Sequence, residues 1–86
     1  MKFKAEIDVM PLDALLDPQG KAVSSSMKNL GLESITNVRI GKHIRLEVEA
    51  PDEDEARKLV DQSCRKLLVN EIMEQYSFTI SALQEA

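Results

Sequence analysis

The residue types that most often carry out catalysis are few and scattered in this chain of 86 residues. His43 follows Gly41 and Lys42, and no Ser or Cys stands beside it to form the nucleophile and base pair that covalent catalysis needs. We expect His43 to be a solvated residue of a turn, with a role as general base as the alternative. Cys64 falls on the apolar side of a helical pattern, so we expect a buried, inert thiol.

Other patterns that could indicate chemistry have simpler structural explanations. The acids Asp52, Glu53, Asp54 and Glu55 could suggest a metal, but consecutive acids at a helix start are explained by capping and by the helix dipole. The three glycines match neither the P-loop nor the dinucleotide-binding fingerprint, and residues 24–26 form a serine run typical of a surface. We therefore expect no catalytic, cofactor-binding or metal-binding residues in this chain.

The segment 17–21 contains residues that the fold by itself does not require. Asp17 and Pro18 form a helix start, yet Gly20 lies within the first turn, where glycine costs about 1 kcal/mol relative to alanine. Either a partner's backbone approaches Gly20 closely, or the contact is a tight one within the domain. Arg39, Lys42 and His43 are likewise basic residues, in an acidic chain, that the fold does not require. The candidate partner interface comprises Asp17, Gln19, Gly20, Lys21, Arg39, Gly41, Lys42 and His43.

Length and charge limit the class of protein. Residues 1–86 suffice for one domain with a two-layer core, but not for a deep enzyme pocket as well, so we expect an oligomer or a partner. A net charge of −4 and a pI near 4.9 argue against nucleic acid as a partner. The N-terminus alternates charge and no long apolar run occurs, which predicts a soluble cytoplasmic protein without a membrane segment. One cysteine also fits a reducing compartment.

Hydrophobic periodicity predicts four strands and two helices. Residues 2–9 alternate as a strand that stops at Met10 and Pro11, and residues 18–30 form a helix that Gly31 ends. Residues 36–40 and 44–49 alternate on either side of Gly41, which predicts a β-hairpin. A second helix begins near Asp52 and ends near Asn70, and residues 76–82 form the last strand.

The expected order is thus βαββαβ, the α+β ferredoxin-like arrangement: one four-stranded antiparallel sheet with two helices on one face. The helices would cover the apolar side chains of the hairpin, which cannot remain exposed to water. The other face would be polar, with Lys4, Glu6, Asp8, Arg39, Arg45, Glu47, Glu49, Ser77 and Thr79.

Several short motifs together resemble the PurS subunit family of phosphoribosylformylglycinamidine synthase, an enzyme of purine biosynthesis. The motifs are residues 16–20 with Ala22 and Val23, Leu30 with Gly31, residues 38–42, and Cys64 followed by Leu67, Leu68, Asn70 and Glu74. They cover nearly the whole chain in the order and spacing of the family. Two departures are Glu71, where the family usually has proline, and Met10 with Pro11 at the end of the first strand.

The resemblance implies a subunit without a catalytic site of its own. It would join an ATP-using synthetase subunit to a glutaminase subunit and support passage of ammonia between them, as a homodimer or tetramer. ATP and Mg²⁺ would be used by the synthetase partner, and this subunit would hold no cofactor.

A rival hypothesis is a small-molecule-binding regulatory module, because βαββαβ domains often dimerise and bind ligands at their interfaces. It would require a ligand-sized pocket with convergent polar groups. A small phosphatase of similar topology would need an anion-binding loop with arginine after the first strand, and residues 10–13 contain none.

Overall fold

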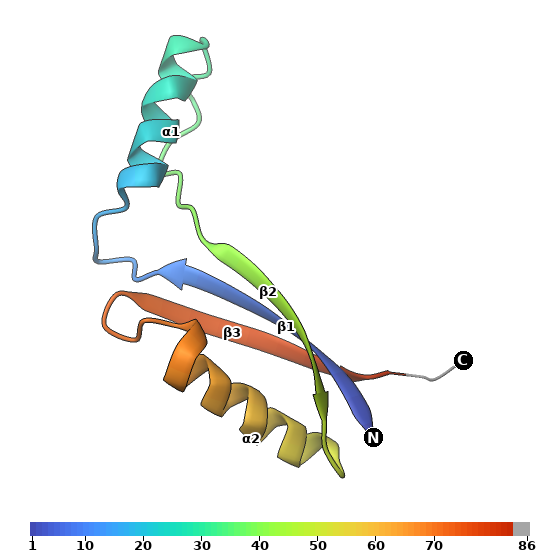
Figure 1. Cartoon of the computed structure of the whole chain (residues 1–86). Coiled ribbons are helices and arrows are strands. Elements are labelled where there is room, and N and C mark those ends of the chain that lie inside the picture. The colour runs from blue at the N-terminus through green and yellow to red at the C-terminus, as the bar shows by residue number, and fades with distance from the viewer. Residues whose placement is uncertain (84–86) are drawn as a thin grey trace.

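The computed structural model describes residues 1–83 and contains three strands and two main helices. In chain order these are β1 (Lys2–Pro11), α1 (Pro18–Asn29), β2 (Lys42–Glu49), α2 (Glu53–Ser63), a π-helical turn η1 (Cys64–Leu68) and β3 (Glu74–Ala82). The chain therefore has a βαβαβ order (Figure 1). The expected α+β class is confirmed, whereas the expected fourth strand is absent from the described residues.

The three strands form one antiparallel sheet in the order β2-β1-β3, with β1 in the centre. Phe3 pairs with Val48 on one side and with Ala82 on the other, and the register is uninterrupted along both ladders. Because side chains alternate along a strand, every odd-numbered residue from Phe3 to Val9 points to one face. Those residues are buried, as the alternation of apolar and polar residues predicts.

The core lies between this face of the sheet and α2. Ala56, Val60 and Cys64 of α2 and its π-helical extension are buried against β1, and side chains of β2 and β3 complete the layer. The opposite face is polar, with Glu6 and Asp8 of β1 between charged residues of β2 and hydroxyl side chains of β3. The polar face expected from the sequence is thus confirmed for all of its residues except Arg39, which lies outside the strands.

Helix α2 begins where the acids predict. The Asp52 carboxylate accepts a hydrogen bond from the Glu55 amide at 2.8 Å, and the first turn contains three acids that favour the positive end of the helix dipole. The helix leaves its α-helical geometry at Cys64, and the Val69 amide donates to the Cys64 carbonyl at 2.9 Å. Val69 then adopts an extended backbone, which directs the chain toward β3.

Helix α1 has the expected bounds but not the expected position. Asp17 caps its first turn, Pro18 occupies the first helical position, and Gly31 adopts a φ of 78° just after its end. The helix points away from the sheet (Figure 1), so the expectation of two helices on one face is wrong. We call residues 18–40, which comprise α1 and the segment returning from it, the arm.

The predicted hairpin is also wrong in its first strand. Residues 35–41 form irregular backbone, and the sheet begins again only at Lys42. Asn37 adopts a left-handed φ of 57°, and the amides of Val38 and Ile40 donate to Ser24 Oγ at 3.1 Å and to Asp17 Oδ2 at 2.8 Å. Both amides are therefore bonded to side chains at and near the start of α1 and not to a neighbouring strand.

Candidate functional site

The arm makes the molecule much longer than a compact domain. The Cα radius of gyration is 16.9 Å and the principal dimensions are 51 × 32 × 14 Å, whereas a compact chain of this length has a radius near 12 Å. Leu30 and Leu32 are 72% and 44% exposed, and Ile35 is 40% exposed. The arm therefore presents apolar side chains to solvent that nothing in the described part of the chain covers.

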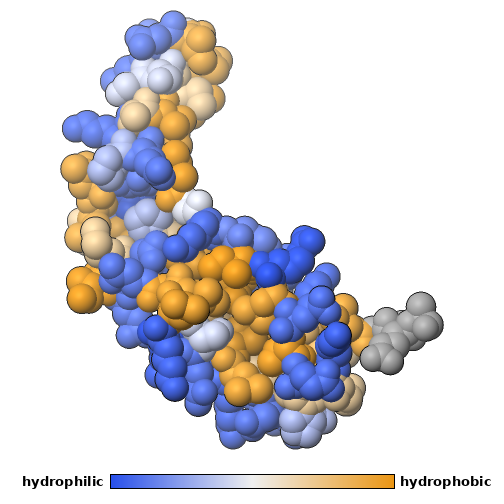
Figure 2. Space-filling model, in the orientation of Figure 1, coloured by the Kyte–Doolittle hydropathy of each residue, from blue (hydrophilic) through white to orange (hydrophobic). Residues whose placement is uncertain are grey.

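The apolar face of the sheet is likewise only partly covered. Because α1 is absent from this face, α2 alone packs on it, and Ile44, Leu46, Tyr76, Phe78 and Ile80 remain half-buried. Figure 2 shows hydrophobic side chains along the arm and on the sheet beside α2. Contiguous exposed apolar surface of this kind is typical of a protein interface. This surface is not expected from the sequence, in which both helices are predicted to cover the sheet.

A set of hydrogen bonds joins the two ends of the arm at its base. The Asp17 carboxylate accepts from the Gly20 amide at 3.0 Å and from the Ile40 amide at 2.8 Å, so it joins the two chain segments that enter and leave the arm. The bond from the Ile40 amide, followed by that from Gly20, holds the pKa of Asp17 below its usual value. Asp17 is buried and thus has a structural role at this position.

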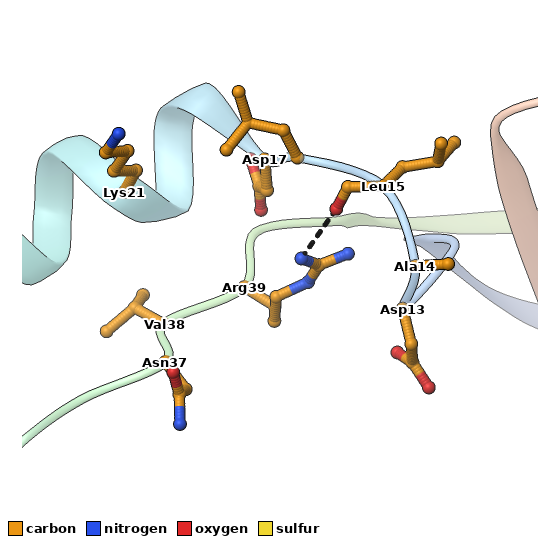
Figure 3. A pocket seen from close by; sticks show the side chains of 9 residues that line it. Asp13, Ala14, Leu15, Asp17, Lys21, Asn37, Val38 and Arg39 are labelled. Atoms are coloured by element: carbon orange, nitrogen blue, oxygen red, sulfur yellow. Dashed lines mark hydrogen bonds between the residues drawn. The ribbon is translucent and has the colours of Figure 1, made fainter.

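Arg39 completes the base of the arm. Its guanidinium donates to the carbonyls of Leu12 and Leu15 at 2.6 and 3.0 Å, and Figure 3 shows the second of these bonds beside an open hollow. The lining of this hollow includes Lys21, which is exposed. Because two guanidinium nitrogens are bonded to main-chain carbonyls, Arg39 sets the path of residues 12–15.

Gly20 and Gly41 are explained by contacts within the chain. A Cβ at Gly20 would lie 2.0 Å from the Val38 carbonyl oxygen, and one at Gly41 would lie 2.1 Å from the Val9 carbonyl oxygen. No side chain fits in such a space, so both positions require glycine. Of the two explanations left open for Gly20, the structure shows close packing within the domain.

His43 does not lie in a turn, contrary to expectation, because the hairpin that would create the turn is absent. It belongs to β2 and projects from the polar face, where Nδ1 lies 2.6 Å from Asp8 Oδ1 and Nε2 lies 2.8 Å from Glu6 Oε2. Hydrogen bonds to Asp8 and then to Glu6 raise the pKa of His43. The imidazole acts here as a cross-strand bridge between two carboxylates.

Arg45 contributes to the same cluster. Its Nε lies 2.8 Å from Glu6 Oε1, so one carboxylate contacts two basic side chains of β2, Arg45 and His43. Desolvation raises the pKa of Glu6, but hydrogen bonds from Arg45 and His43 outweigh it and leave that pKa below its usual value. The cluster joins β1 to β2, and its basic side chains, His43 and Arg45, are paired with its carboxylates, Glu6 and Asp8.

The remaining predicted interface residues are free of such constraints. Gln19 and Lys21 are exposed on the first turns of α1, and Lys42 is exposed with its Nζ 3.9 Å from Glu74 Oε2. An exposed ion pair of this length contributes little to stability. Contact of these residues with a partner stays a prediction.

Cys64 is fully buried, as the helical pattern predicts. Burial, together with the nearby charge of Asp61, raises the pKa of its thiol, which disfavours the reactive thiolate. Within residues 1–83 there is also no group of three or more His, Cys, Asp or Glu side chains arranged to hold a metal ion. No helix in the same range is long and apolar enough to span a membrane.

The structure is that of a small α+β protein with surfaces for association. Leucines are exposed on the arm, the sheet is only half covered, and the charged side chains on the polar face are paired with one another. The family model described as PurS, phosphoribosylformylglycinamidine (FGAM) synthase, matches residues 4–82. The chain belongs to this family, and the resemblance found in the sequence is confirmed. Its family places it among the subunits of FGAM synthase in purine biosynthesis.

Individual relatives agree with this assignment. The chain is 47% identical to phosphoribosylformylglycinamidine synthase subunit PurS of Synechocystis sp. over 98% of its own length and 84% of the relative's. The PurS structure from Bacillus subtilis is 34% identical, with a TM-score of 0.84 over 93% of this chain and 99% of that one. A chain of the PurLQS structure from Thermotoga maritima is 32% identical, with a TM-score of 0.86 over 94% and 99%.

Proposed function

We propose that this chain is a non-catalytic subunit of FGAM synthase that joins the synthetase subunit to the glutaminase subunit and supports transfer of ammonia between them. The observation that carries the proposal is the arm, whose apolar side chains and rigid base are suited to contact with other chains. The relative in the PurLQS structure of Thermotoga maritima, a complex by its name, supports the same role. ATP and Mg²⁺ belong to the synthetase in this proposal, and the complex acts in the cytoplasm.

We also propose that the chain associates with itself, as a dimer or tetramer. The sheet lacks the second helix that would cover its apolar face, and α1 lacks a surface on which to pack. In a symmetric oligomer, the arm of each copy can supply the missing cover for another copy. Burial of apolar surface at about 25 cal/mol per Å² would favour this arrangement.

The decisive experiment is reconstitution with the synthetase and glutaminase subunits of the same organism. Glutamine-dependent formation of product is expected to require this chain, whereas turnover supported by added ammonium should depend on it much less. Equal glutamine-dependent turnover with and without this chain would contradict the bridging role.

Two variants localise the surface. Leu32→Glu places a charge on the exposed apolar side of the arm, and it should lower glutamine-dependent turnover at least tenfold. Ser25→Glu adds the same charge at an exposed position of α1 and serves as the matched control. Lys42→Glu tests the predicted interface beside β2, and a weaker association that is most marked at low salt is the expected result.

The regulatory-module hypothesis is tested by thermal shift of the isolated chain with amino acids and nucleotides. The hollow at the base of the arm gives this hypothesis little support. Arg39, the arginine that lines it, already donates to two main-chain carbonyls and not to a ligand.

A further inference from the structure

A second cleft adjoins the hollow beside Arg39, where the arm meets the sheet. It has a volume of about 310 Å³ and lies between residues 11–18, which lead from β1 into α1, and residues 70–74, which lead from η1 into β3 (Figure 1). We call it the junction cleft. The Leu12 amide donates to the Met73 carbonyl at 2.9 Å and so ties the two connections together. The cleft is therefore formed before any partner binds, which lowers the cost of ordering on association.

Large apolar side chains are exposed at the junction cleft. Leu16 and Met73 line it and are 73% and 54% exposed, and Ile72, next to Met73 in the chain, is 84% exposed. Figure 2 shows hydrophobic side chains gathered where the arm meets the sheet. Apolar side chains around a preformed hollow are typical of a pocket that receives an anchor side chain of a binding partner.

The polar side chains that line the junction cleft already have partners within the chain. Asp17 accepts from two main-chain amides, as described above. Asn70 accepts from the Ile72 amide at 3.1 Å, and Glu74 accepts from the Asn70 amide at 2.9 Å. A site for a polar metabolite needs free polar groups that converge on the ligand, and these three side chains are committed elsewhere. The lining therefore suits an apolar side chain better than a polar metabolite.

The charges beside the junction cleft favour a basic partner. Asp13 and Glu71 belong to the two connections and are exposed, and neither makes an ion pair with another residue in the range 1–83. Glu74, in contrast, lies 3.9 Å from Lys42 Nζ. A second copy of this chain has a net charge of −4 and would bring the same two acids to a symmetric contact, so it is poorly suited to this cleft.

We propose that the junction cleft receives one large apolar side chain, flanked by lysine or arginine, from another subunit of FGAM synthase. The apolar side chain enters between Leu16 and Met73, and the basic residue beside it meets Asp13 or Glu71. Burial of the apolar anchor supplies most of the affinity, while the opposite charges set the orientation and the association rate.

This contact rests on the bridging role proposed above and deepens it by naming the chemistry of one partner segment. The junction cleft and the exposed leucines of the arm are different surfaces. Variants of the cleft can therefore be compared with Leu32→Glu on the arm in the same assays.

The first test measures binding of this chain to the synthetase subunit and to the glutaminase subunit separately. Leu16→Lys removes an apolar wall and adds a positive charge, so it should weaken binding to one of the two about tenfold or more. Leu16→Met keeps the apolar volume and is the matched control, with an expected change below about threefold. Parent-like hydrogen exchange at the Leu12 amide shows that the cleft itself is intact. Parent-like binding by Leu16→Lys, or a parent that binds neither subunit, would overturn the proposal.

The second test concerns the charge of the partner segment. The double variant D13N/E71Q should lower the association rate about threefold at low ionic strength and make that rate less dependent on salt. The control E53Q/D54N removes the same charge from exposed positions at the start of α2. An unchanged salt dependence in D13N/E71Q would refute a basic partner.

The third test identifies the occupant. Leu16→p-benzoylphenylalanine places a photo-crosslinker in the cleft, and Gln62→p-benzoylphenylalanine on the exposed side of α2 is the control. In the three-subunit mixture, the first variant should crosslink to another subunit, at an apolar residue next to lysine or arginine. Crosslinks only between copies of this chain, or none above the control, would refute the proposal.

The same mixture separates failure of the cleft from failure of the bridging role. Full glutamine-dependent turnover without the crosslink would refute docking at the cleft and support the bridging role. A crosslink to another subunit, with turnover that does not depend on this chain, would support docking and contradict bridging.

Discussion

The Asp17 carboxylate and the Ile40 amide, 23 positions apart in the chain, lie 2.8 Å apart and join the two ends of the arm. The same carboxylate caps α1 through the Gly20 amide, so one side chain both caps the helix and joins it to the segment that leads into β2. The direction of the arm decides which surfaces are left open for other chains. The base of the arm is therefore where a small change should have a distant effect.

Replacing Asp17 by Asn tests this connection. The Gly20 and Ile40 amides donate to different oxygens of the carboxylate, and Asn would present a donor NH2 group in place of one of these oxygens, so one of the two bonds is lost. We expect faster hydrogen exchange at the Ile40 amide, while the sheet amides stay protected as in the parent. Asp13→Asn, at an exposed position of the same connection, is the control. Unchanged exchange at Ile40 would show that the arm is held by other contacts.

The same group predicts a response to acid. The pKa of Asp17 is lowered in the folded chain, chiefly by the bond from the Ile40 amide, so its contribution to stability is fully present above the unfolded value near 3.9. The contribution is lost as the pH falls through the lower folded pKa. Protection of Ile40 should thus decrease below pH 4 in the parent, and Asp17→Asn should abolish that dependence.

Gly20→Ala should destabilise the chain although alanine favours helices. The added methyl would lie 2.0 Å from the Val38 carbonyl oxygen, and relief of such overpacking costs about 1–3 kcal/mol. Urea denaturation measures the change in the free energy of unfolding. Ser25→Ala on the exposed side of the same helix should change it by less than about 0.5 kcal/mol. Equal stability of the two variants would mean that the return segment at Val38 shifts freely away from α1.

His43 predicts a dependence on pH in the opposite direction. Its pKa is raised in the folded chain by Asp8 first and then by Glu6, so the bridge contributes fully below the unfolded pKa near 6.5. The contribution is lost as the pH rises through the higher folded pKa. The stability of the parent relative to His43→Gln should therefore decrease between pH 6.5 and that folded value, and NMR titration of the ring locates it. A difference that does not change with pH would contradict the bridge.

Cys64→Ser should destabilise the fold without impairing the function of the assembled complex. The hydroxyl would replace a fully buried thiol, and an unsatisfied buried hydroxyl costs about 1–3 kcal/mol. Cys64→Ala is the control that removes the sulfur without adding a polar group, and it should cost less. Loss of turnover in a folded Cys64→Ser complex would instead give the thiol a direct role.

Local sequence patterns were enough to predict those elements whose residues interact with near neighbours in the chain or with a single adjacent strand or helix. The alternation in β1 and β3, the caps Asp17 and Asp52, and the buried stripe that contains Cys64 all follow from periods of 2.0 and 3.6 residues. The family could also be identified from short motifs spread along the chain. These features depend on side-chain type and spacing, which the sequence shows directly.

Tertiary structure decided the positions of residues 36–40 and of α1. Val38 and Ile40 alternate like strand residues, but a strand forms only where its amides and carbonyls pair with those of a neighbouring strand. Their amides bond instead to Ser24 and Asp17, and Gly20 allows the Val38 carbonyl to approach the helix. Competition among distant partners for the same backbone groups thus turned a predicted hairpin into the return segment of an arm. It also carried His43 from a predicted turn into β2.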